Sequence, residues 1–431
     1  MFERFILADV LRVTLGYAYS AILKQEGSVW IAGVNSRMTR GMNKCFVMTI
    51  PSSVTAVAAG HSHIIVLKQD GSVWASGRNA RGQLGDGTKA KRDIFIFAQM
   101  IPGAKAVAAG GRHSMVLTQD GDIWATGWNK YGQLGNGVKA YAVRFFVVIA
   151  GGVKAVSAGD AHSIVVMQDG SVWATGQNQN GQLGDGSRED RGTFVKVMST
   201  PWGSYNVATD VSAGGYHSLV LKADGSVWVT GMNKDGQMGD GSTTDRVKYM
   251  QVIWDGVAAV AAGSRHSIAL MQDSSVWAAG YNLFGQLGDG STTDSAIFIP
   301  VITDGAKAVA AGAFHSMVFK EDGSVWVTGS NQHGQFGDGS TRSSNTFIRL
   351  VSSLDDGARK NAIIHMRATF ACMFYFHLTV KIHASAGFFS TKTTKAFTVV
   401  TTKIETKTNG SNSVVMISVV FIRVSFTRYT R

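Results

Sequence analysis

The feature that most constrains this chain is a sequence repeat with a period of about fifty residues. Around Trp173 one copy reads KAVSAG, then HSIVVMQDGSVWATG, then NQNGQLGDG, and the other copies follow the same pattern. The central tryptophans are spaced by 44, 50, 49, 55, 49 and 49 residues; they are Trp30, Trp74, Trp124, Trp173, Trp228, Trp277 and Trp326. Such a period indicates seven structural units that fold alike and pack on their neighbours.

Each copy contains four short apolar segments, which predict four β-strands. The segments are rich in Val, Ile and Trp and are bounded by Gly, Asp and Asn. In the third copy the predicted strands are 105–109, 114–118, 122–127 and 143–149. Asp-Gly joins the second and third strands in most copies, which is a strong hairpin signal. The sixth copy has Asp273-Ser274 instead, so we expect a slightly weaker turn with the same topology.

The composition and the first strand of each copy favour a closed ring of blades. The chain has 51 glycines and only 4 prolines, which indicates many turns and argues against a helical bundle. Several first strands read Ala-Val-Ala-Ala-Gly, as at 106–110, and such small side chains fit where blades converge on an axis. The larger tryptophan is expected to fill the space between neighbouring blades. We therefore predict an all-β, seven-bladed propeller of four-stranded blades over residues 1–357.

The repeated pattern also resembles a known family. The segments Ala-Gly-x-x-His-Ser and Asp-Gly-Ser-Val-Trp-x-x-Gly-x-Asn-x-x-Gly-Gln-Leu-Gly-Asp-Gly are similar to the RCC1 (regulator of chromosome condensation) repeat, over about residues 5–355. The resemblance implies a seven-bladed β-propeller. In this family the fold serves an exchange factor for a small GTPase, parts of ubiquitin ligases, a plant photoreceptor and a β-lactamase inhibitor, so the fold alone does not settle function.

Two regions depart from the family pattern. The first copy has Tyr19 at the histidine position and residues 38–43 in place of Gly-Gln-Leu-Gly-Asp-Gly, which predicts a degenerate first blade. After residue 357 the repeat stops. Residues 358–431 hold 11 of the 41 Lys and Arg residues but one of the 29 Asp and Glu residues, and 2 of the 51 glycines. This basic tail is either a small β segment with a hairpin turn at Asn409-Gly410 or the product of a shifted reading frame.

Six histidines recur at one repeat position: His63, His113, His162, His217, His266 and His315. Equivalent positions in a propeller lie on a ring and cannot converge on one ion, so we expect no metal site. We predict instead that both ring nitrogens satisfy backbone groups at blade corners. The two cysteines, Cys45 and Cys372, are too few for a disulfide framework or a cysteine-based zinc site. No cofactor and no catalytic constellation is expected.

The positions that vary between copies are the candidates for partner binding. Two residues separate Ala-Gly from His, and by the resemblance they lie on one face around a central channel. Arg and Tyr are enriched in interface hot spots, so the expected contact face is His61, Arg112, Asp160, Tyr216, Arg265 and Phe314. The alternative is that these are ordinary solvated loop tips. Neither position holds Trp in any copy, and Trp128 is expected to lie elsewhere, so a photoreceptor is excluded.

The sequence therefore predicts a non-catalytic scaffold that presents one face of the propeller to a protein partner. The alternative is a guanine-nucleotide exchange factor for a Ras-like small GTPase, which acts by differential binding. The near-neutral body argues against nucleic acid as its main partner, whereas the tail could bind nucleic acid nonspecifically. No segment suggests a signal peptide or a membrane span, and we expect an intracellular monomer, cytoplasmic or nuclear.

Overall fold

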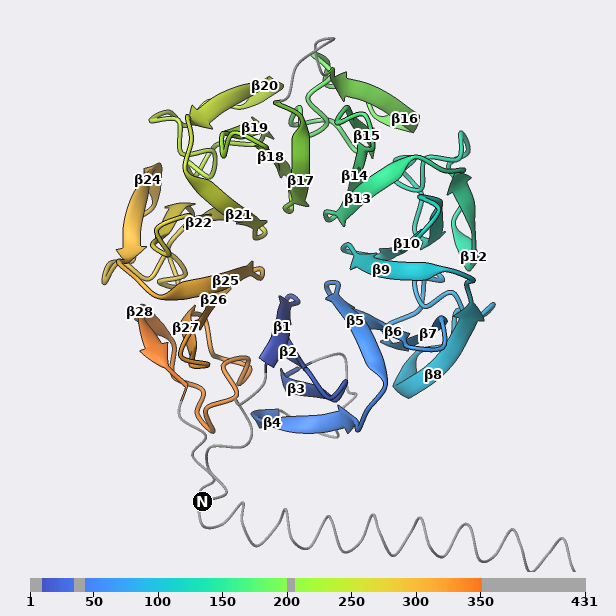
Figure 1. The fold of residues 1–431 in the computed structure, drawn as a ribbon, viewed down its shortest axis with the longest axis horizontal. Coiled ribbons are helices and arrows are strands. Elements are labelled where there is room, and N and C mark those ends of the chain that lie inside the picture. The colour runs from blue at the N-terminus through green and yellow to red at the C-terminus, as the bar shows by residue number, and fades with distance from the viewer. Residues whose placement is uncertain (1–9, 35–42, 200–205, 351–431) are drawn as a thin grey trace, which may run out of the picture. The chain divides into compact units, whose positions relative to one another are not determined.

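The computed structural model describes residues 10–34, 43–199 and 206–350. These ranges form seven four-stranded antiparallel sheets, and in each sheet the strands follow one another in sequence order. Figure 1 shows the sheets as blades arranged around a central axis. The predicted all-β, seven-bladed propeller is therefore confirmed. No helix in these ranges is long and apolar enough to cross a membrane. The tail 358–431, with both of its interpretations, lies outside the described residues.

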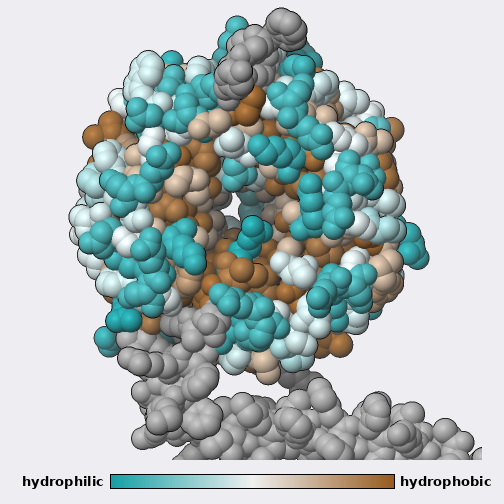
Figure 2. All heavy atoms as spheres, viewed as in Figure 1, coloured by the Kyte–Doolittle hydropathy of each residue, from teal (hydrophilic) through white to brown (hydrophobic). Residues whose placement is uncertain are grey.

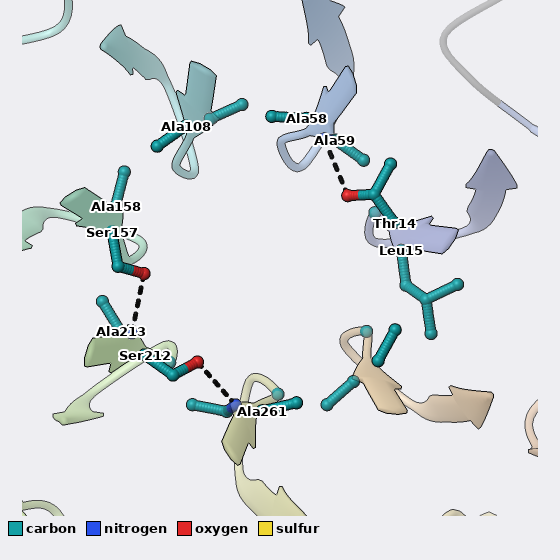
Figure 3. A pocket seen from close by; sticks show the side chains of 18 of the residues that line it. Thr14, Leu15, Ala58, Ala59, Ala108, Ser157, Ala158, Ser212, Ala213 and Ala261 are labelled. Carbon is teal, nitrogen blue, oxygen red and sulfur yellow. Dashed lines mark hydrogen bonds between the residues drawn. The ribbon is translucent and has the colours of Figure 1, made fainter. Parts of the chain in front are cut away.

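The innermost strand of each blade is built largely from small residues and lines the channel. These strands are β1 (Val10–Leu15), β5 (Val54–Ala59), β9 (Ala104–Ala109), β13 (Val153–Ala158), β17 (Ala208–Ala213), β21 (Val257–Ala262) and β25 (Ala306–Ala311). Figure 3 shows the short side chains of these strands around the channel, which encloses about 550 Å³. Where neighbouring strands offer hydroxyls, these bind across the gap: Ser157 Oγ accepts the backbone N–H of Ala213 at 3.0 Å.

The second and third strands form the hairpin at the middle of each blade. The second strands are β2 (Tyr19–Lys24), β6 (His63–Lys68), β10 (His113–Thr118), β14 (His162–Met167), β18 (His217–Lys222), β22 (His266–Met271) and β26 (His315–Lys320). The third strands are β3 (Val29–Gly33), β7 (Ser72–Gly77), β11 (Ile123–Gly127), β15 (Val172–Gly176), β19 (Val227–Gly231), β23 (Val276–Gly280) and β27 (Val325–Gly329). In the third copy the observed strands begin and end within one residue of the predicted ones.

The sixth hairpin keeps the predicted topology. Gly121 of the third copy has a φ of 86°, and Ser274 at the equivalent position has a φ of 68°. A residue with a β-carbon is disfavoured in this left-handed region. The pairing is nevertheless unchanged, since Leu270 opposes Val276 in the sixth blade as Leu117 opposes Ile123 in the third.

The outermost strands complete the blades and are linked to the preceding blade. They are β4 (Asn43–Ile50), β8 (Arg92–Met100), β12 (Ala142–Ile149), β16 (Arg191–Met198), β20 (Arg246–Ile253), β24 (Ser295–Ile302) and β28 (Ser344–Arg349). The loop before each of the six outermost strands from β8 to β28 is a turn organised by a buried asparagine: Asn79 Oδ1 accepts the N–H of Leu84 at 3.0 Å, and its Nδ2 donates to Asp86 at 2.9 Å. Asp86 also forms a β-bridge with Arg144 of the next blade.

The apolar cores lie between blades. One core joins Val73 and Ala75 of blade 2 to Val107 and Phe145 of blade 3, and Trp124 packs against it. The repeated tryptophans thus lie at the blade junctions, but they are half-buried and not enclosed. Most of their indole N–H groups are hydrogen-bonded; in Trp74 the N–H donates to Ser72 Oγ at 2.9 Å.

Within the described residues the ring closes by packing, since blades 7 and 1 each consist of four consecutive strands. Blade 7 contributes Met317 and Phe336, and blade 1 contributes Ile22 and Phe46, to one buried cluster. The first blade, predicted to be degenerate, has all four strands. The predicted degeneracy concerned the residue pattern and not the number of strands, and four strands are what the sequence predicted for every blade. Of the two departures from the repeat, Tyr19 lies in β2 and the other begins in the loop before β4. Residues 35–42 of that loop lie outside the described residues.

Candidate protein-interaction face

The six repeated histidines link each of blades 2 to 7 to the next blade around the ring. Each Nε2 lies 2.8–3.0 Å from a serine Oγ of the following blade, in the pairs His63–Ser114, His113–Ser163, His162–Ser218, His217–Ser267, His266–Ser316 and His315–Ser20. The serine hydroxyl donates back to a backbone carbonyl of the blade that holds the histidine, as Ser114 does to Gln83 of blade 2 at 2.7 Å. Because the single hydroxyl proton goes to the carbonyl, the histidine must donate through Nε2–H. Each of these six junctions therefore contains a short relay of hydrogen bonds.

These histidines are fully buried and neutral. The prediction that both ring nitrogens bind backbone groups is wrong, because Nε2 bonds to a side chain and Nδ1 has no hydrogen-bond partner. Nδ1 and Cε1 lie against a glycine; a β-carbon at Gly60 would stand 2.4 Å from Cε1 of His63. Burial lowers the pKa of five of them to about 3 and that of His217 to about 4. Over the described ranges, no three His, Cys, Asp or Glu side chains are grouped to hold a metal ion.

The junction between blades 1 and 2 uses a different pair of residues. Tyr19 replaces the histidine, and its hydroxyl lies 3.0 Å from the Gly60 carbonyl and 2.5 Å from the His63 carbonyl. Ile64 replaces the serine, and both side chains are fully buried. Burial raises the pKa of Tyr19, so the hydroxyl keeps its proton. The two replacements match each other, since a serine in place of Ile64 would have no histidine to bind.

The loops between the first and second strands form a ring at the mouth of the channel. Backbone N–H groups in these loops donate to a carbonyl of the next blade, as Gly111 does to Gly159 at 3.1 Å and Ala313 to Gly16 at 3.3 Å. Figure 2 looks onto one face of the propeller, where hydrophobic residues and some hydrophilic ones surround the opening of the channel and hydrophilic residues gather further out. The structure places the six predicted contact residues on these loops. All six are half-buried: His61, Arg112, Asp160, Tyr216, Arg265 and Phe314.

Part of this face is a packed set of aromatic rings, which we call the aromatic arc. Its members come from blades 6, 7, 1 and 2 and are Tyr281, Phe284, Phe314, Tyr17 and His61. The ring of Phe314 lies 5.3 Å from Tyr17, 5.1 Å from Phe284 and 6.4 Å from Tyr281, and Tyr17 lies 5.5 Å from His61. Tyr17 is 44% exposed and Leu283, beside Phe284 in the chain, is 59% exposed. The arc is therefore an apolar surface that remains open to solvent.

Charged members of the face are partly neutralised by neighbours. Arg265 donates to Asp235 at 2.7 Å, and its guanidinium lies 4.7 Å from the Tyr281 ring centroid. His61 Nε2 lies 2.5 Å from an oxygen of Asp160. Burial alone would lower the pKa of His61, but the charge of Asp160 and the hydrogen bond to it raise that pKa above its usual value. These contacts hold the loop side chains in place.

The sequence reasoning missed several residues of this face. Trp128 was expected elsewhere, yet its ring lies 5.2 Å from the Arg112 guanidinium and 5.3 Å from the Tyr131 ring. Trp128, Tyr131, Tyr281 and Phe284 all follow a third strand, at the variable positions of Gly-x-Asn-x-x-Gly. Their variation between copies was the signal that could have found them.

Comparison with known proteins identifies the family. The family model of the RCC1-like domain matches residues 3–256, and that of the regulator of chromosome condensation (RCC1) repeat matches 257–286 and 306–335. The chain therefore belongs to the RCC1-like family, as the repeat pattern implied. A search of curated protein sequences gave no match.

Solved structures with the same fold are distant in sequence. Human WBSCR16 superposes with a TM-score of 0.63 at 22% identity, covering 72% of this chain and 86% of that one. Prp20p from Saccharomyces cerevisiae gives a TM-score of 0.65 at 19% identity, covering 78% of this chain and 86% of that one. Yeast Prp20 bound to Kap60 gives 0.65 at 19% identity, with coverage of 81% and 86%. At these identities the similarity establishes the fold alone.

Proposed function

We propose that this propeller is a non-catalytic protein-interaction scaffold, which binds a protein partner through its loop face. The aromatic arc is the observation that carries the proposal. Its rings hold one another in defined positions, and Tyr17 and Leu283 remain exposed beside them. Large, rigid aromatic side chains around a concave centre are typical anchors of protein interfaces, because their burial stabilises a complex at a small entropic cost.

The chemistry of the described residues supports binding and not bond formation. The repeated histidines and serines are buried in blade junctions, where no substrate reaches them. On the face itself, His61 and Arg265 are engaged by Asp160 and Asp235. We further propose that the protein works as a monomer inside the cell, in the cytoplasm or nucleus, where a chain with two cysteines needs no disulfide framework.

The second candidate is a guanine-nucleotide exchange factor for a Ras-like small GTPase. Its support is the fold shared with Prp20p, whose structure is described together with its binding properties to Gsp1p and histones. Exchange needs no side-chain chemistry, because tighter binding of the nucleotide-free partner is sufficient. At 19% identity the shared fold does not assign exchange activity to this chain. Exchange activity is therefore one of the outcomes that the following crosslinking experiment distinguishes.

Site-specific photo-crosslinking tests the proposal. A photoreactive amino acid replaces Leu283 beside the arc in one full-length variant, and Trp254 in a second. Trp254 is 77% exposed and lies between β20 and β21, at the end of the blade away from the loop face. We expect one protein to crosslink from position 283 and not from 254, and Phe314→Ala to reduce that crosslink several-fold.

The identity of the captured protein separates the two candidates. A small GTPase that is released by added GTP would support the exchange factor over the scaffold. Equal crosslinking from positions 283 and 254, or crosslinking that is unchanged by Phe314→Ala, would contradict binding through the loop face.

A further inference from the structure

A second surface on the loop face lies over the junction of blades 2 and 3. Two hollows adjoin there and share Arg81. The first encloses about 270 Å³ and is lined by Arg78, Ala80, Arg81, Gln83 and Arg112. The second encloses about 380 Å³ and is lined by Arg81, Trp128, Lys130, Lys139 and Tyr141. Together they form what we call the basic groove, which runs from the inner loop that holds Arg112 to the residues just before β12.

The cations of the basic groove have no carboxylate partner in the described part of the chain. Ion pairs within 4.0 Å are found for other arginines of the same propeller, such as Arg92 with Asp86, Arg191 with Asp185 and Arg246 with Asp240. No such ion pair in the described residues involves the three groove arginines or the two groove lysines, which are Arg78, Arg81, Arg112, Lys130 and Lys139. Three guanidinium groups around one hollow repel one another, and an anionic ligand would relieve that repulsion.

Aromatic rings line the groove and hold some of its cations in place. The Arg112 guanidinium lies 5.2 Å from the Trp128 ring, and the Trp128 ring packs edge-on against Tyr131 at 5.3 Å. The Lys130 ammonium lies 5.2 Å from the Tyr131 ring. Such stacking orders the side chains before a ligand arrives, which reduces the entropy lost on binding.

We propose that the basic groove binds an acidic peptide segment, in which two or more Asp or Glu side chains are followed by an apolar one. Arginine forks match carboxylates in bidentate geometry, so Arg78, Arg81 and Arg112 would hold the acidic residues. The Trp128 and Tyr141 rings would pack on the apolar side chain. The inference rests on the proposed function, because it assigns a partner chemistry to part of the same face.

The extent of the positive surface favours a peptide over a nucleic acid. Nucleic-acid grooves follow a phosphate backbone over a long positive path. Here the groove cations come from blades 2 and 3 only, and on other parts of the face Arg265 is paired with Asp235 and His61 with Asp160. A short anionic segment fits this extent.

Fluorescence anisotropy with the full chain tests the inference. The probe is a fluorescein-labelled ten-residue peptide that contains four Asp or Glu residues and one Leu, and the control peptide has Asn and Gln in their place. We expect the acidic peptide to bind and the control to bind at least tenfold more weakly. Arg81→Ala should weaken binding about tenfold and the Arg81→Ala, Arg112→Ala double variant more, because each removes charge-assisted hydrogen bonds.

Matched variants separate the groove from other positive regions. Arg342→Ala removes the same charge from an exposed position in blade 7 and should leave the affinity unchanged. Arg81→Lys keeps the charge but loses the fork, and should fall between wild type and Arg81→Ala. Thermal unfolding checks that every variant is folded; Arg78→Ala replaces any variant that is not.

Three results would overturn the inference. The first is equal affinity for the acidic and control peptides. The second is an affinity for the acidic peptide that the groove substitutions leave unchanged, as expected if the peptide binds to the basic tail. The third is a single-stranded oligonucleotide that binds more tightly than the peptide and is itself lost in Arg81→Ala, which would assign the groove to nucleic acid. Crosslinking at position 283 reports separately on the arc, so that result and the groove result can fail independently.

Discussion

The junction between blades 1 and 2 and the six other blade junctions solve one packing problem in two ways. In the six, a buried imidazole donates to a serine of the next blade, and that serine donates to a backbone carbonyl. In the junction between blades 1 and 2, the Tyr19 hydroxyl lies close to two backbone carbonyls, and an isoleucine occupies the serine position. What the ring requires is thus a satisfied buried polar link at each junction and not a particular residue.

The two kinds of junction differ in how they respond to protons. A buried histidine has a pKa far below its usual value, whereas a buried tyrosine stays neutral at any ordinary pH. Six junctions therefore lose stability in acid and one does not. This difference can be measured.

The largest expected effect is a loss of stability as the pH falls from about 6.5 towards 4. In that range a histidine of the unfolded chain, with a pKa of about 6.5, binds a proton, whereas the buried histidine of the folded protein does not. Each buried histidine therefore lowers the free energy of unfolding by about 1.4 kcal/mol for each pH unit of acidification. Hydrogen bonds from Ser72 lower the pKa of Asp70, and such carboxylates lose their contribution only below about pH 4. Denaturant unfolding at pH 7.5, 6 and 5 measures the slope.

A histidine variant makes this test specific. His162→Gln removes one of the six titrating groups and should lower the slope by about one sixth, even though the variant is less stable at pH 7.5. Stability that is constant between pH 7.5 and 5 would mean that these histidines are not buried as neutral groups.

The next largest effect is expected on exchanging the two kinds of junction. Tyr19→His and Ile64→Ser should each cost about 3–5 kcal/mol, because each leaves a buried polar group without its partner or removes buried apolar volume. The double variant should recover about 2 kcal/mol of the sum, since the introduced histidine and the introduced serine can then bond to each other. Denaturant unfolding of the four proteins measures this coupling.

The reverse exchange is the matched control. His113→Tyr with Ser163→Ile converts a histidine junction into the tyrosine kind, and the two changes should likewise be less damaging together than separately. Strictly additive losses in both cycles would show that the residues at each junction do not depend on one another.

A smaller effect is expected at the tryptophans, which both kinds of junction share. Trp74 packs against the core at the tyrosine junction, and Trp173 against the core between blades 3 and 4. Both rings are half-buried, so replacement by alanine should cost about 2–3 kcal/mol, less than for an enclosed aromatic ring. Arg112→Ala should stay within about 0.5 kcal/mol. Unequal losses for the two tryptophans would show that the junction type also affects the apolar core.

The smallest effect is expected at Ser274, in a hairpin turn remote from the polar links of both junction types. Ser274→Gly removes a β-carbon from a left-handed backbone position and should stabilise the protein by about 0.5–1 kcal/mol. The gain should be the same in wild type and in the Tyr19→His, Ile64→Ser variant. A destabilising result in thermal unfolding would show that the serine side chain contributes more than its strain costs.

Interactions within one copy were predictable from the sequence. The short apolar segments bounded by Gly, Asp and Asn and the Asp-Gly turns placed the strands of the third copy to within one residue, because hairpin pairing depends on near neighbours in the chain. The small residues of the inner strands likewise indicated convergence on an axis. The loop positions of Arg112 and Phe314 followed from comparing the copies.

Interactions between copies were not predictable in the same way. Ser114 lies 51 residues from His63, and the Tyr19 hydroxyl binds a carbonyl 44 residues away. The sequence of one copy therefore does not indicate which residue of the next copy its side chains contact. For the same reason the aromatic arc and the basic groove were missed: each gathers residues from more than one loop of the face. The sequence alone determined the number of blades and the strands within them, because these depend on local periodicity. Only the tertiary structure decided which side chains meet across a junction or on the loop face, since that depends on how rigid blades are placed beside one another.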